Sequence, residues 1–189
     1  MASAWGRRGR GLWLPVSSLV LLFLTAFLLK FERKPFPGFA GALGFKPLRQ
    51  WLDSVKRGAV LLTALLFFYI LAALVLPAFF SQKELAAVSQ SVLKMPLLAL
   101  LTAVSLGPLA EEVFFRGFLQ QRVGVFFSSA VFAGLHFSYA STPEVLVAFA
   151  ASVLIGLEFR KNKDLNACIA GHALFNAVQI GLALSVPFA

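Results

Sequence analysis

Long apolar runs alternate with short polar or basic connectors along the whole chain. These runs predict helices at residues 12–29, 59–80, 95–122, 123–139, 145–159 and 165–188. An α-helix of about 20 apolar residues has the length that crosses the hydrocarbon core of a bilayer. The pattern therefore predicts an all-α fold, a polytopic transmembrane bundle of about six spanning helices.

Composition narrows the class of protein further. The chain has 189 residues, of which 59% are hydrophobic and 13% are charged. A soluble domain carries about 25% charged residues, so an ordinary soluble enzyme is excluded. The single cysteine, Cys168, has no partner for an internal disulfide and cannot form a cysteine-based zinc site.

The net charge of +9 comes from 17 Lys and Arg residues against 8 Asp and Glu residues. The basic excess lies in connectors 30–57, 116–122 and 160–164, whereas 81–94 and 141–144 are nearly neutral. The two sets alternate across the predicted spans, so the basic set is expected to face the cytoplasm. The charge indicates membrane lipids, not nucleic acid, as the partner.

Two regions are predicted. Residues 1–58 contain an N-terminal helix and a basic amphipathic connector, and residues 59–189 form the membrane-embedded core, with the motifs within 95–180. Within the connector, residues 47–57 predict a surface helix with Trp51 at the membrane interface. The orientation of the N-terminal helix stays open, because a span at 12–29 places the arginines before it on the opposite side from the other basic connectors.

An unusual acidic pair interrupts the third apolar run. Pro108 is expected in the first turn of a new helical piece, where its missing N–H does no harm. Glu111 and Glu112 are then expected in the same first turn, where the helix dipole favours negative charge. Ionisable groups inside a membrane cost about 2.5–3.5 kcal/mol each, so both glutamates are functional candidates.

Spacing separates the roles of the two glutamates. Glu112 and Arg116 are four residues apart and are expected to form an ion pair on one helix face. Glu111 points about 100° away and has no partner on its own helix. A carboxylate in that position is a candidate general base.

The chain has two histidines, and both lie in apolar runs. His136 follows Phe132 by four residues, and Phe132 is expected to pack beneath it. His172 and Asn176 are also four residues apart, so they present two hydrogen-bonding groups on one helix face. Two such donors suit the stabilisation of an oxyanion.

The depths of these residues permit them to meet. At about 1.5 Å per residue, Glu111 lies roughly 20 Å from Met95, toward the cytoplasmic end of its run. His172 and Asn176 lie roughly 10–17 Å from Leu165, and His136 lies up to about 20 Å from the start of its run. All four can lie in the inner half of the bilayer.

Taken in this order, Glu-Glu-x-x-x-Arg, Phe-x-x-x-His and His-x-x-x-Asn resemble the CPBP family of CAAX proteases and bacteriocin-processing enzymes, also called the ABI family. The family includes the Ras-converting CAAX endopeptidase. The resemblance implies a hydrolase, an intramembrane endopeptidase in which Glu111 and His136 activate water. It also implies that His172 and Asn176 stabilise the oxyanion and that Glu112 and Arg116 support the site.

The resemblance further implies a membrane-bound peptide or protein substrate, lipidated in CAAX-box protein processing. It favours a multi-pass protein of a bacterial plasma membrane with its active-site cleft toward the cytoplasm. No cofactor is required in this interpretation. The family's frequent label of metalloprotease leaves a zinc variant open, with Glu111, His136 and His172 as ligands.

Two other classes remain as alternatives. The first is a non-catalytic immunity factor or scaffold with the same fold. The second is a proton-coupled transporter, because Glu and His residues inside membranes also relay protons. The absence of an inverted repeat in the sequence speaks against transport.

Overall fold

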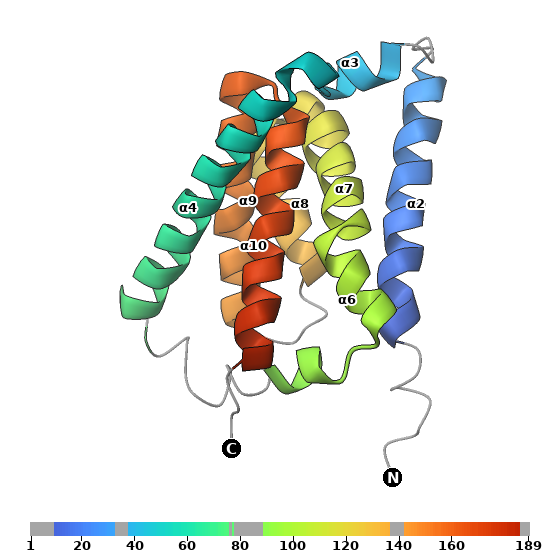
Figure 1. Cartoon of the computed structure of the whole chain (residues 1–189). Coiled ribbons are helices and arrows are strands. Elements are labelled where there is room, and N and C mark those ends of the chain that lie inside the picture. Colours follow the sequence, from blue (N-terminus) through green and yellow to red (C-terminus); the bar gives the residue numbers. More distant parts are fainter. Residues whose placement is uncertain (1–9, 33–37, 76, 78–88, 137–141, 186–189) are drawn as a thin grey trace.

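The computed structural model describes residues 10–32, 38–75, 77, 89–136 and 142–185, and every regular element within these ranges is a helix (Figure 1). The predicted all-α membrane bundle is confirmed. In chain order the elements are α2 (Arg10–Phe31), α3 (Phe39–Leu43), the 3-10 helix η2 (Leu48–Gln50), α4 (Trp51–Val75), α6 (Leu97–Val104), α7 (Leu106–Glu112), the π-helix η4 (Val113–Leu119), α8 (Gln120–Leu135), α9 (Thr142–Asn162) and α10 (Leu165–Ser185).

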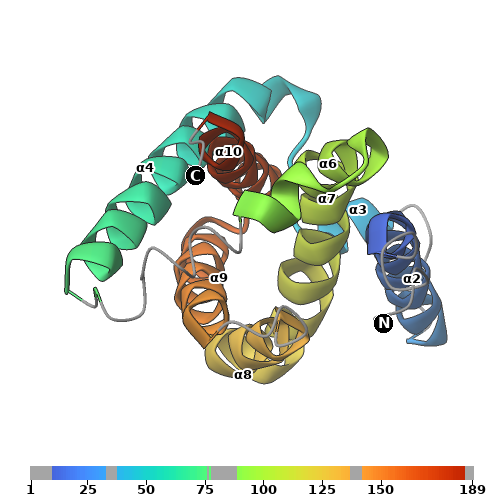
Figure 2. The same cartoon turned by 90° about the horizontal axis from the view of Figure 1, so that it is seen from below.

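Four helical elements form the centre of the bundle. Viewed along the bundle, α7, α8, α9 and α10 stand around a common axis (Figure 2). Helix α4 packs along the outer side of α10, and α2 packs beside α6 and α7. The three motifs lie on α7–η4, α8 and α10, so the central helices carry the candidate site.

Four helical stretches among the described residues are long and apolar enough to cross a membrane. They are Leu14–Phe31, Phe39–Val75, Leu97–Leu135 and Leu165–Ser185. The expected spans 95–122 and 123–139 fall in one of these stretches, within which the chain reverses at Gly124, whose φ is 80°. The expected span 145–159 is α9, which is not among the four. Expectations for residues 1–9, 33–37, 78–88, 137–141 and 186–189 lie outside the described part of the chain.

The basic connectors gather at one end of the bundle, where α2 ends and α4 begins (Figure 1). There Arg122 forms an ion pair with Glu32, which joins the start of α8 to the end of α2. The hydroxyl of Ser54 donates to Asp164 at 2.9 Å, and Arg57 lies 3.5 Å from the same carboxylate. These contacts agree with the predicted grouping of the basic connectors on one side.

The predicted surface helix at residues 47–57 is wrong. Residues 48–50 form a short 3-10 turn, and α4 begins at Trp51 and continues without a break to Val75. The reason is tertiary. The buried positions of α4 recur every three or four residues and form one continuous stripe against its neighbours, namely Ser54, Gly58, Leu61 and Leu65.

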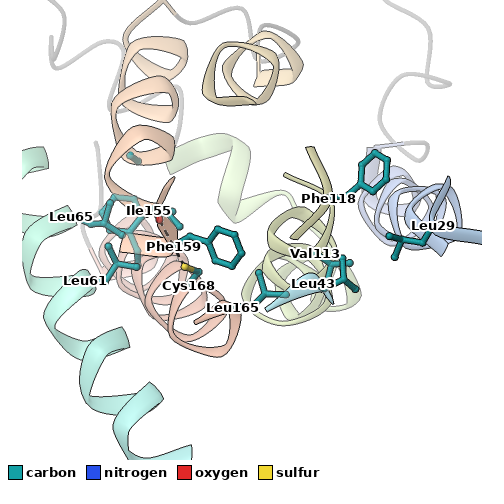
Figure 3. Packing of buried hydrophobic residues seen from close by; sticks show 12 residues of the cluster. Leu29, Leu43, Leu61, Leu65, Val113, Phe118, Ile155, Phe159, Leu165 and Cys168 are labelled. Atoms are coloured by element: carbon teal, nitrogen blue, oxygen red, sulfur yellow. Dashed lines mark hydrogen bonds between the residues drawn. The ribbon is translucent and has the colours of Figure 1, made fainter. Parts of the chain in front are cut away.

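An apolar cluster of buried side chains joins the outer and central helices. Leu61 and Leu65 of α4 meet Ile155 and Phe159 of α9 and the start of α10 (Figure 3). Cys168 lies fully buried in this cluster, with its Sγ atom 3.8 Å from the carbonyl oxygen of Ile155. Cys168 therefore acts as a small packing residue.

The close contact between α4 and α10 depends on glycine. A Cβ atom at Gly58 would lie 2.9 Å from the Cβ of Ala170 and 3.2 Å from the carbonyl oxygen of Ala167. Neither atom is the end of a flexible side chain, so the helices would have to separate. Small residues at such contacts let membrane helices approach closely.

We expect Gly58→Ala to lower the free energy of unfolding by about 1–3 kcal/mol, because it overpacks this contact. The matched control is Gly181→Ala on α10, where a Cβ would meet nothing within 4 Å. In an exposed helix position that change is neutral or stabilising by up to about 1 kcal/mol. Unfolding of both variants in one detergent measures the difference. A Gly58→Ala protein as stable as the Gly181→Ala protein would contradict the proposed role of the contact.

Candidate active site

A break between α6 and α7 sets the position of the glutamates. Ser105 leaves the helical conformation, with φ of −135° and ψ of −85°, and α7 begins at Leu106. Pro108 therefore lies in the first turn of a new helix, as predicted. The placement of Glu111 and Glu112 in that turn is wrong, because the break precedes Pro108 by three residues and the glutamates end α7.

The predicted ion pair forms where α7 passes into the π-helix η4. Nε of Arg116 lies 3.0 Å from Oε2 of Glu112, and the two side chains are 1% and 0% exposed. A single π-turn inside an α-helix often marks a functional site. The pair is confirmed, and its complete burial means that each charge depends on the other.

Helix α9 completes the surroundings of Arg116. Nη2 of Arg116 donates to the carbonyl oxygen of Ser152 at 3.2 Å and to its hydroxyl at 3.1 Å. The guanidinium carbon also lies 5.1 Å from the centre of the Phe132 ring. Ser152 is not predicted from the sequence, because one serine in an apolar run does not stand out.

His172 lies between the two glutamates. Its Nδ1 is 2.7 Å from Oε1 of Glu112, and its Nε2 is 3.7 Å from Oε2 of Glu111. A carboxylate only accepts hydrogen bonds, so Nδ1 of His172 is the donor to Glu112. The Glu112 bond therefore orients the ring, and Nε2 is turned toward Glu111. This contact joins α7 to α10.

His136 lies beside the same group of side chains. Its ring packs against Phe132 at a centroid distance of 4.5 Å, which confirms the predicted packing. The Phe132 ring also lies 6.1 Å from the His172 ring, so one phenylalanine contacts both histidines. Nδ1 of His136 donates to the carbonyl oxygen of Phe132 at 2.9 Å.

Asn176 contacts the broken helix. Its Nδ2 donates to the carbonyl oxygen of Ala103 at 2.9 Å, next to the break after α6. A carboxamide nitrogen carries two N–H groups, so this bond uses one and leaves the other for a ligand. Since α10 is a regular helix, Asn176 lies one turn beyond His172 on the same face.

The two glutamates differ sharply in exposure. The side chain of Glu111 is 26% exposed, whereas that of Glu112 is fully buried. Of the two carboxylates, that of Glu111 alone lies partly at the surface of the bundle. The structure brings Glu111 and Glu112 together with His172. The ring of His136 packs against Phe132. Asn176 lies on the same helix as His172.

The zinc variant requires its three candidate ligands to lie together in one group that could hold a metal ion. Among the described residues, no group of three or more His, Cys, Asp or Glu side chains is placed to hold a metal ion. Glu111, His136 and His172 all belong to the described part, so they do not form a ready metal site. A catalytic zinc needs three protein ligands and an open position.

Residues 93–178 match the family described as Type II CAAX prenyl endopeptidase Rce1-like. The match includes all three motifs and confirms the resemblance inferred from them. A Bacillus subtilis (strain 168) protein described as "Uncharacterized protein YpbD" is 37% identical over 70 residues. That match covers 36% of this chain and 37% of the relative, little more than a third of its length. No solved structure matches the chain.

Proposed function

Because residues 93–178 form an Rce1-like region, we propose that this membrane protein is an intramembrane endopeptidase that hydrolyses a peptide bond near the membrane. One observation carries the proposal. A partly exposed carboxylate, Glu111, lies beside the ring of His172, and a buried carboxylate, Glu112, orients that ring. This arrangement offers a general base and an oriented hydrogen-bond donor in one place.

In the proposed reaction, Glu111 and His136 hold a water molecule. Glu111 takes a proton from the water as its oxygen attacks the substrate carbonyl, and the carbonyl oxygen becomes an oxyanion. The proton then passes from Glu111 to the leaving amine as the C–N bond breaks. The products are a new carboxyl terminus and a new amino terminus, and Glu111 returns to its starting state.

His172 and Asn176 stabilise the oxyanion in this proposal. With both ring nitrogens protonated, His172 donates Nδ1–H to Glu112 and Nε2–H to the oxyanion. The second N–H of the Asn176 amide is the other donor. Fixed donors of this kind lower the transition-state energy without reorganisation at the moment of reaction. Glu112 and Arg116 support the site by holding His172.

The proposed substrate is a membrane-bound peptide or protein, lipidated or not. His172 and Asn176 lie roughly 10–17 Å below the end that carries the basic connectors, at about 1.5 Å per residue from Leu165. We place that end at the cytoplasmic face of a bacterial plasma membrane. The division into residues 1–58 and a protease core at 59–189 remains part of the proposal.

The test is a cleavage assay with the protein reconstituted in lipid vesicles. A library of membrane-tethered peptides is added, and new termini are identified by mass spectrometry. Cleavage at defined bonds supports the proposal. Absence of cleavage across the library, together with proton flux across the vesicle membrane, would favour the transporter. Absence of both would favour the immunity factor or scaffold.

We expect cleavage to survive exhaustive chelation, because the described residues do not assemble a metal site. Activity is measured before and after removal of metals, together with metal analysis of the purified protein. Equal rates within about twofold and less than about one metal per ten molecules are the expected results, since loss of a catalytic zinc would remove its bound nucleophile. Activity lost on chelation and restored by zinc would contradict the expectation.

A further inference from the structure

A continuous chain of buried polar contacts runs from α9 to the histidine of α10. The Ser152 hydroxyl accepts from Nη2 of Arg116 at 3.1 Å, and Nε of Arg116 lies 3.0 Å from Oε2 of Glu112. Oε1 of Glu112 in turn accepts from Nδ1 of His172 at 2.7 Å. The four residues belong to α9, η4, α7 and α10, so the chain spans the centre of the bundle.

Because these four side chains are buried, the loss of any one of them is expected to disturb the other contacts in the series. Ser152, Arg116, Glu112 and His172 are 1%, 1%, 0% and 7% exposed. Hydrogen bonds in such low-dielectric surroundings are stronger and polarise one another. The central contact, between Nε of Arg116 and Oε2 of Glu112, is an ion pair without hydrogen-bond geometry, and water does not screen it.

Ser152 determines how the guanidinium group of Arg116 is turned. Nη2 carries two N–H groups, and the carbonyl oxygen and the hydroxyl of Ser152 accept from that same nitrogen. Two acceptors from one residue hold the guanidinium plane, and the plane determines where Nε points. Without the hydroxyl, Nη2 keeps only the carbonyl contact with residue 152, and one of the constraints on the guanidinium plane is lost.

We infer that Ser152 is a positioning residue that acts through Arg116 and Glu112 to hold the His172 ring in the orientation for oxyanion binding. This inference rests on the proposed endopeptidase function for its kinetic consequence. Ser152 touches neither water nor substrate in the proposed reaction. Its effect is therefore on kcat, through the placement of a donor, and not on substrate binding.

The kinetic test is Ser152→Ala. We expect kcat to fall about tenfold with KM unchanged, because a small misplacement of a catalytic group is costly. The backbone carbonyl of residue 152 still accepts from Arg116, so the unfolding temperature stays near that of the wild type. The matched control is Ser18→Ala on α2, another buried serine, whose hydroxyl donates to the carbonyl oxygen of Leu14 at 2.8 Å.

A measurement in a double-variant background tests whether Ser152 acts through Arg116 and Glu112. In a Glu112→Gln/Arg116→Met background, which removes both charges of the buried pair and keeps similar side-chain volumes, Ser152→Ala is expected to have no further effect on kcat, because the contacts between Ser152 and His172 are already interrupted. A full tenfold loss in that background would overturn the inference, and so would an unchanged kcat in the single variant.

A spectroscopic readout does not depend on cleavage. The chain has only two histidines, so the ring nitrogens of His136 and His172 give a simple ¹⁵N NMR spectrum in lipid nanodiscs, assigned with a His136→Gln variant. We expect Ser152→Ala to shift the His172 signals and leave those of His136 in place. Unchanged His172 signals would overturn the inference. If Ser152→Ala shifts the His172 signals but the wild-type protein cleaves no peptide, the positioning role is supported and the proposed protease function is contradicted.

Discussion

Glu111→Gln is expected to abolish peptide cleavage and to leave the helix bundle folded. The carboxamide keeps the size of the side chain but does not take a proton from water. General acid–base groups contribute about 10²–10⁴-fold to a rate, so a loss of at least about 10³-fold is expected when the base itself is removed. Because the Glu111 side chain is 26% exposed and is not part of the Glu112–Arg116 pair, its replacement leaves that buried pair in place.

The measurement compares kcat/KM and the unfolding temperature for the wild type, Glu111→Gln and a control. Glu158→Gln is the control, because it removes another carboxylate of the bundle, one that contacts Asn162 near the end of α9. We expect this control to keep its activity within about threefold, as surface-edge changes alter little. A Glu111→Gln protein with full activity would remove Glu111 from the reaction and with it the proposed mechanism.

The inactive Glu111→Gln protein also offers a route to the substrate. A variant that binds but does not cleave retains its substrate, so crosslinking in membranes followed by mass spectrometry identifies what is held. Capture by Glu111→Gln that is absent from the Glu158→Gln control identifies a substrate of this site.

Arg116→Ala is expected to destabilise the protein by about 3–5 kcal/mol, the cost of leaving one partner of a buried ion pair uncompensated. Glu112 is fully buried, and its charge would then face only His172. Folded yield in membranes and unfolding in detergent measure the effect. A variant as stable as the wild type would show that the pair contributes nothing to the fold.

A double variant separates the fold from the reaction. Glu112→Gln combined with Arg116→Met removes both charges and keeps side chains of similar volume. Replacement of a buried ion pair in this way is often neutral or stabilising by about 1–4 kcal/mol, so the folded yield is expected to recover. Cleavage is expected to stay low, because the carboxamide at position 112 would no longer hold His172 as a carboxylate does. Recovery of both yield and full activity would contradict the supporting role of the pair.

Local spacing predicted much of the candidate site correctly. The Glu112–Arg116 pair and the packing of Phe132 on His136 each join residues four apart, and one turn of helix brings such residues together whatever surrounds them. The break near Pro108 was also predictable, because proline restricts its own helix. The exact start of α7 was not, and the glutamates proved to end that helix instead of beginning it.

Contacts between distant segments were beyond the reach of sequence patterns. His172 and Glu112 are 60 residues apart, and nothing in either motif indicates that the ring of one donates to the carboxylate of the other. Ser152 and the carbonyl oxygen of Ala103 have no sequence signal of their own. The surface helix expected at 47–57 failed for the same reason, since packing against α10 continues α4 through it.

The sequence by itself determined that this is a membrane protein, that its elements are helices, and which few ionisable residues lie in its apolar runs. These properties follow from the spacing of apolar residues and from the length of each apolar run, and both can be read within a short stretch of sequence. Tertiary structure alone decided which glutamate is exposed, which one holds His172, and which serine holds Arg116. Those differences depend on how α7, α9 and α10 pack, and packing between helices is a property of the whole bundle, in which a polar group must find a partner wherever the other helices place one.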